Sequence, residues 1–69
     1  MKTYYFTFGF GQKNEGYCQP VLAKSSKAAR NRMVDLYGDK WAFQYTEDEF
    51  KQYRLDGTLT EVLLEIIRD

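Results

Sequence analysis

Few residues of this chain could carry out catalysis. It contains no histidine, the commonest general acid or base and the commonest neutral metal ligand in proteins. Its one cysteine, Cys18, has neither an imidazole to activate it nor a second thiol with which to hold zinc. Glu47 and Glu49 could contact a hard cation, but their spacing is not that of a calcium-binding loop. We therefore predict no catalytic residue, no metal site and no cofactor, and a protein that is not an enzyme.

A glycine-rich loop is one candidate for binding phosphate. Gly9, Gly11 and Gly16 surround Lys13 and Asn14, and backbone N–H groups in such a loop can form a concave anion site. However, the loop leads into another strand, whereas a phosphate-binding loop leads into a helix. An ordinary hairpin loop is therefore the preferred interpretation, and the phosphate site is the alternative.

Aromatic and basic side chains are the remaining candidates for function. Six Tyr, five Phe and one Trp supply rigid contact area, and Arg presents paired donors to carboxylates or phosphates. Stacking combined with phosphate contacts would also suit single-stranded nucleic acid. The formal net charge is zero, however, and general affinity for a polyanion depends on net positive potential. Nucleic-acid binding is therefore disfavoured, whereas a small anionic ligand, which needs less charge, is retained.

The charges are unevenly distributed along the chain. Positions 1–34 carry six basic residues and one acidic residue, a net charge of +5, and positions 35–69 carry four basic and nine acidic residues, a net charge of −5. This asymmetry hints at an anionic partner on one side and a basic partner on the other. If the two halves interleave in the fold, the charges would instead form solvated surface pairs.

The clearest strand covers residues 2–10. Aromatic side chains alternate with other residues there and occupy one face: Tyr4, Phe6, Phe8 and Phe10. After the loop at 11–16, residues 17–23 have the composition of a second strand, and a hairpin is expected. Pro20 has no N–H to donate, so it places this second strand at a sheet edge or at a position whose N–H would point to solvent.

An amphipathic helix is expected over residues 27–37. Ser25 and Ser26 are suitable N-cap residues, and Gly38 can end the helix with a positive φ. The apolar face consists of Ala29, Met33, Leu36 and Tyr37. The outer face is basic and consists of Lys24, Lys27, Arg30 and Asn31. This stripe is either the solvated side of the helix or a surface for phosphates.

An aromatic strand is expected directly after the helix. Trp41, Phe43 and Tyr45 alternate with smaller or polar residues, so they would share one face. We expect this face to lie on the helix, with Phe43 in the core. Trp41 and Tyr45 each carry a polar group that needs a partner or water, which makes them candidates for a surface role.

The remaining residues predict a second, short helix and a C-terminal strand. Thr46 and Glu49 form a capping-box pattern, and Gly57 is a stop signal. Residues 58–67 fit both a strand and a helix, and a strand is preferred because it would complete the sheet. The prediction is one small α+β domain over 1–69. It has a small antiparallel sheet with a ββαβ core, packed against one amphipathic helix.

Length and composition limit the assembly and the compartment. A domain of this size has a thin core, which a homodimer would enlarge. One cysteine cannot form an internal disulfide, which favours a reducing compartment. No apolar run approaches the 18 residues of a membrane span, and we see no signal peptide. We therefore expect a cytoplasmic protein that does not enter a membrane.

Three stretches of the sequence carry a resemblance to a known group of proteins. They are KTYYFTFG at 2–9, a serine-rich cap leading into Ala29, Arg30 and Met33, and YGDKWAFQY at 37–45. In these stretches the chain resembles small uncharacterised proteins encoded by phages and prophages of Gram-positive bacteria. The resemblance extends through Phe50. It implies an accessory protein of a mobile element in the host cytoplasm, a class that often acts on host machinery, including host defence.

Together these observations predict a non-enzymatic phage-type protein that binds and blocks or sequesters a host component, as an anti-defence protein would. The expected contact residues are Tyr4, Tyr5, Arg30, Lys40, Trp41 and Tyr45. The alternative is a homodimeric small-ligand module that binds a nucleotide or a nucleotide-derived signal. A weak single-stranded nucleic-acid binder is the second alternative.

Overall fold

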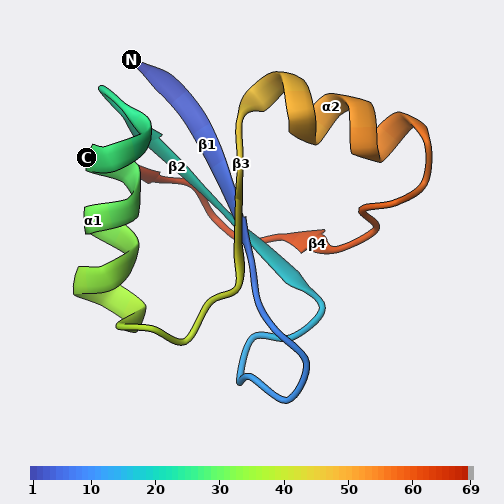
Figure 1. Ribbon diagram of the computed structural model, residues 1–69, viewed down its shortest axis with the longest axis horizontal. Helices are drawn as coiled ribbons and strands as arrows, with labels where there is room; N and C mark the ends of the chain where they lie inside the picture. Colours follow the sequence, from blue (N-terminus) through green and yellow to red (C-terminus); the bar gives the residue numbers. More distant parts are fainter. Residues whose placement is uncertain (69) are drawn as a thin grey trace.

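The computed structural model describes residues 1–68 as two helices and five short strands in one sheet (Figure 1). The elements are β1 (Lys2–Thr7), β2 (Tyr17–Ala23), α1 (Ser26–Tyr37), β3 (Phe43–Tyr45), α2 (Glu47–Leu55), β4 (Val62–Leu63) and β5 (Ile67–Arg68). The strand order is β3-β1-β2-β4, and β5 also pairs with β2. This arrangement confirms the predicted α+β fold and the strand character of the C-terminal segment.

The sheet is mixed and not purely antiparallel. β1 pairs antiparallel with both β2 and β3, as the predicted core requires. β4 and β5 run parallel to β2 along its other side. The reason is the connection through α2, which takes the chain from the β3 edge of the sheet to the opposite edge. The chain therefore enters beside β2 in the same direction as β2 itself.

Pro20 lies on an interior strand, so the prediction of a sheet edge is wrong. β2 has β1 on one side and β4 with β5 on the other. The N–H groups of Val62 and Leu64 donate to the carbonyls of Gly16 and Cys18, at 3.0 and 2.9 Å. Because alternate residues of a strand face the same neighbour, the Pro20 nitrogen points to this side as well. It falls in the gap between β4 and β5, where no ladder bond is required of it.

The side chain of Gln19 bridges that gap. Its Nε2 donates to the carbonyl of Pro20 at 2.9 Å and to the carbonyl of Glu65 at 2.7 Å. Its Oε1 accepts from the hydroxyl of Tyr37 at 3.0 Å. A buried amide is tolerable only when it is hydrogen-bonded, and here both ends have partners. Gln19 thus joins β2, the C-terminal segment and the end of α1.

One face of the sheet packs on α1. The core on this face consists of Tyr4, Phe6, Phe8, Val21, Ala23, Ala29 and Met33. The helix begins and ends as its sequence predicts. The Ser25 hydroxyl accepts from the Ala28 N–H at 3.1 Å, and Gly38 ends the helix with a φ of +63°.

The opposite face packs on α2, which begins at the predicted capping box. The Thr46 hydroxyl accepts from the Glu49 N–H, and the Glu49 carboxylate accepts from the Thr46 N–H. The core on this face consists of Cys18, Phe50 and Leu59, with Tyr5, Tyr45 and Tyr53 packed against it. The ring of Tyr5 stacks on that of Phe50, with centroids 3.8 Å apart.

The expected aromatic face of residues 41–45 does not form. Regular pairing begins only at Phe43, and the Ala42 N–H bonds to the Thr7 carbonyl just before the strand starts. Trp41 consequently packs on the α1 face, whereas Tyr45 lies on the α2 face. Phe43, predicted to be in the core, is 63% exposed.

A substitution at Met33 tests whether this residue lies in the core beneath α1. Met33→Ala is expected to lower the free energy of unfolding by about 2–5 kcal/mol, because it leaves a cavity in a fully buried position. Phe10→Ala is the control, since Phe10 is 97% exposed and its removal should change stability by no more than about 0.5 kcal/mol. Urea unfolding of both variants makes the measurement. Equal losses would contradict the assignment.

Substitutions at Gln19 and Tyr37 test the hydrogen bonds that Gln19 makes to β2, the C-terminal segment and α1. Gln19→Leu leaves the carbonyls of Pro20 and Glu65 and the Tyr37 hydroxyl without this partner, at about 1–3 kcal/mol for each group left unsatisfied. Tyr37→Phe removes one donor only and is expected to cost about 1 kcal/mol. Thermal unfolding of the two variants compares the losses. A Gln19→Leu protein as stable as the wild type would show that the bridge is dispensable.

Candidate functional site

The predicted contact residues do not form one site. Tyr4 is 8% exposed and belongs to the α1 core, so its ring has little area left for a partner. Tyr5 and Tyr45 are half-buried on the α2 face. Arg30 and Trp41 meet at a groove beside α1, and Lys40 lines a different hollow. Arg30 and Trp41 are therefore brought together beside α1, and Tyr5 and Tyr45 are cross-strand partners on the opposite face of the sheet.

The groove between α1 and the start of β3 has a volume of about 420 Å³. Its lining residues are Arg30, Val34, Gly38, Asp39, Trp41 and Ala42, and we call it the α1–β3 groove. Helical spacing places Arg30, Val34 and Gly38 in a row, four residues apart, along one side of α1. The loop after Gly38 supplies the opposite wall. The groove thus combines apolar walls with one cation and one anion.

Trp41 is held in a defined orientation in this groove. Its Nε1 donates to the Gly38 carbonyl at 3.1 Å, and its ring meets that of Phe6 edge to face at 5.1 Å. The guanidinium carbon of Arg30 lies 5.6 Å from the centre of the Trp41 ring, within the range of a cation–π contact. A guanidinium stacked in this way keeps its in-plane N–H groups free to bind a carboxylate or phosphate.

Lys40 lines a separate hollow of about 380 Å³. Its other lining residues are Lys13, Asn14, Leu36 and Tyr37. Arg30 lies on α1 and Lys40 lies in the loop that follows α1, and the two residues line different hollows. The structure therefore does not arrange these two cations around one shared anion position.

Several amides of the glycine-rich loop are hydrogen-bonded within the loop itself. The Gly9 N–H donates to Gln12 Oε1, and the Gly11 N–H donates to Glu15 Oε1 at 3.1 Å. Further turns bond Gln12 N–H to the Gly9 carbonyl and Glu15 N–H to the Gln12 carbonyl, both at 3.0 Å. The carboxylate of Glu15 thus takes the place that a bound anion would occupy. The hairpin-loop interpretation is favoured over the phosphate site.

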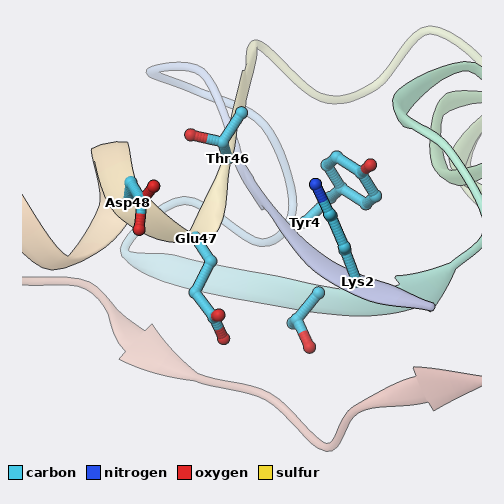
Figure 2. Close-up of a pocket in the computed structure, with 6 residues that line it drawn as sticks. Lys2, Tyr4, Thr46, Glu47 and Asp48 are labelled. Carbon is cyan, nitrogen blue, oxygen red and sulfur yellow. The ribbon is translucent and has the colours of Figure 1, made fainter.

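A third hollow, of about 310 Å³, lies between β1 and the first turn of α2. Figure 2 shows the Lys2 amine and the Glu47 carboxylate pointing away from each other. The remaining lining residues are Thr3, Tyr4, Thr46 and Asp48. The acidic residues also suit the positive end of the helix dipole, which accounts for them without a ligand. The polar groups that line this hollow therefore do not converge on one point.

Two exposed apolar residues near the β3 edge were not among the predicted contacts. Val34 is 49% exposed and lines the groove, whereas the ring of Phe43 lies on the α2 face, 6.4 Å from that of Tyr45. Val34 had a usable signal in the sequence, because it is an apolar residue on the basic outer face of the helix. Phe43 had none, since its exposure depends on where the strand begins.

Cys18 is buried on the α2 face. Burial raises the pKa of its thiol to about 11, and nearby Glu61 raises it further while Arg54 opposes the shift. Burial also raises the pKa of Tyr5, with a smaller effect from Glu47. A thiol with a raised pKa is a poor nucleophile at neutral pH. Cys18 thus behaves as a small apolar residue of the core.

Neither a metal-binding cluster nor a known relative points to a further site in residues 1–68. Among residues 1–68, no three His, Cys, Asp or Glu side chains are grouped so that they could hold a metal ion. Neither of the two helices described is long and apolar enough to cross a membrane. Comparison with models of protein families, with curated proteins and with solved structures finds no match. These comparisons therefore add nothing to the case for function.

Because burial raises the pKa of the Cys18 thiol, we expect the stability of the protein to depend on pH. Its pKa lies near 9 without burial and at about 11 in the fold, so between these values the folded protein keeps a proton that the unfolded chain releases. The stability contribution is complete below pH 9 and is lost as the pH rises to 11. Cys18→Ala removes this dependence. Urea unfolding at pH 8.5 and 10.5 should show a larger loss for wild type than for the variant, and equal losses would contradict the burial effect.

Proposed function

We propose that the protein is a non-enzymatic binding protein that occupies the surface of a host protein and thereby blocks or sequesters it. The surface that carries the proposal surrounds the β3 edge and consists of three groove residues on the α1 face and Phe43 on the α2 face: Arg30, Val34, Trp41 and Phe43, which we call the β3-edge surface. The resemblance to phage and prophage proteins supports a host partner, including a component of host defence. In this account the protein acts in the host cytoplasm by occupancy and not by chemistry.

The exposure of Phe43 is the observation that favours this proposal most. Phe43 is 63% exposed and contributes little to the core; its ring lies 6.4 Å from that of Tyr45 on the α2 face, whereas half-exposed Val34 and Trp41 line the groove on the α1 face. Interfaces are enriched in such aromatic residues and in arginine, and Arg30 lies over the Trp41 ring. An exposed aromatic ring and a groove with a bidentate donor thus lie on the two faces of the same sheet edge.

The nucleotide alternative has weaker support. A volume of about 420 Å³ lies within the range of small-ligand pockets, and Arg30 could contact a phosphate. However, a base would have to compete with Arg30 for the face of Trp41, and Lys40 points to another hollow. A protein surface places no such demand on Trp41. We therefore rank host-protein binding first.

Recovery of the tagged protein from Gram-positive bacterial cells tests the proposal. Wild type is expected to retain one host protein in a fixed stoichiometry. Phe43→Ser should reduce the retained amount at least tenfold, because loss of a central aromatic contact commonly costs more than 1.4 kcal/mol, which is tenfold in affinity.

Leu55→Ser is the matched control. Leu55 is 85% exposed at the end of α2, so this change removes a comparable apolar side chain away from the β3-edge surface. Equal retention by all three proteins, or no stoichiometric partner with wild type, would overturn the proposal. Release of a nucleotide-sized molecule on denaturation, seen by native mass spectrometry, would favour the ligand module instead.

A further inference from the structure

β3 is an edge strand whose outer side is open. β1 pairs with one side of β3, and no strand within residues 1–68 pairs with the other. In an antiparallel ladder, every second residue directs its N–H and C=O away from the paired neighbour. Phe43 and Tyr45 face their β1 partners Thr7 and Tyr5, so in β3 the outward N–H and C=O are those of Gln44. Such an edge can accept an extended segment from another chain as an additional strand.

The two faces beside this edge have different chemistry. On the α1 face, Gln44 Nε2 donates to the Ser26 carbonyl at 2.9 Å, which ties β3 to the first turn of α1. Lys27 and Arg30 are exposed on the helix just beyond that contact. On the other face, the rings of Phe43 and Tyr45 lie 6.4 Å apart. A strand added to β3 would therefore meet cations on one face and aromatic rings on the other.

The α1–β3 groove has room for side chains on the cationic face. Arg30 lines it, and its guanidinium is already positioned by the Trp41 ring. Asp39 lines the groove near the C-terminal end of α1, two helical turns beyond Arg30. Acidic side chains are consequently favoured at the end near Lys27 and Arg30 and disfavoured near Asp39. This charge distribution selects both the sign and the position of the partner's charges.

We propose that the partner presents an extended acidic segment that adds as a strand to β3. Side chains alternate across a strand, so carboxylates at every second position face Lys27 and Arg30. The intervening apolar side chains lie against Phe43 and Tyr45. This inference rests on the proposed function, because it assigns a binding mode to the same β3-edge surface.

A synthetic peptide tests the binding mode. The probe is a blocked octapeptide that alternates glutamate with valine, and its control alternates lysine with valine. Trp41 is the one tryptophan of the chain, so its fluorescence reports directly on the groove. Titration with the acidic peptide should change the fluorescence to saturation, and amide hydrogen exchange should slow at Gln44, whose N–H faces the open side of β3. The basic peptide should do neither.

Charge variants identify the face of the edge that is used. Arg30→Ala should weaken binding of the acidic peptide about tenfold, the equivalent of losing one charge-assisted contact. Lys51→Ala removes the same charge from exposed α2, which covers the other sheet face, and should leave the affinity unchanged. Raising the salt concentration should weaken binding to wild type more than binding to Arg30→Ala.

The outcomes separate this inference from the proposed function. Absence of saturable binding by the acidic peptide, equal binding of the basic peptide, or binding without slower exchange at Gln44 would each overturn strand addition. If one of these results accompanied Phe43-dependent retention of a host protein, the inference would fail and the function would stand. If peptide binding held but no host protein were retained, the function would fail instead.

Discussion

The buried amide of Gln19 is the contact on which the sheet depends. β2 pairs with β1 on one side and with β4 and β5 on the other, yet Pro20 in its centre has no backbone N–H to donate. The Gln19 side chain bonds the carbonyls of Pro20 and Glu65 where the ladder is interrupted, and it accepts from the Tyr37 hydroxyl. One side chain therefore bonds a carbonyl of β2 and a carbonyl of the link between β4 and β5, and it fixes the end of α1 against them.

β3 is one edge of the sheet, and β4 with β5 forms the opposite edge. The loop that leads to β3 starts at the end of α1, which Tyr37 anchors through Gln19. Trp41 is then fixed by the Gly38 carbonyl and by Phe6, and it in turn supports Arg30. The β3-edge surface is thus built on well-packed residues, which limits the entropy that a partner must remove on binding.

Local patterns in the sequence were sufficient for the elements, but not for which aromatic residues are exposed. The capping residues Ser25 and Thr46 and the stop at Gly38 depend on neighbouring residues alone, so both helices were predictable. Pro20 and Phe43 were misplaced because strand order and the start of β3 depend on distant partners. Among the site residues, Arg30 and Trp41 meet as part of one surface, whereas Tyr4 was assigned to the surface and lies in the core.

The parallel pairing of β5 with β2 has a consequence for the order of folding. The bond from Gln19 to Glu65 spans 46 residues, whereas the β1–β2 hairpin joins positions as close as Thr7 and Cys18. Longer loops close more slowly, so we expect the hairpin to assemble first and the C-terminal strands to dock last. Until then one side of β2 is uncovered. Pro20, which cannot donate a hydrogen bond at its centre, makes that temporary edge a poor template for pairing between chains.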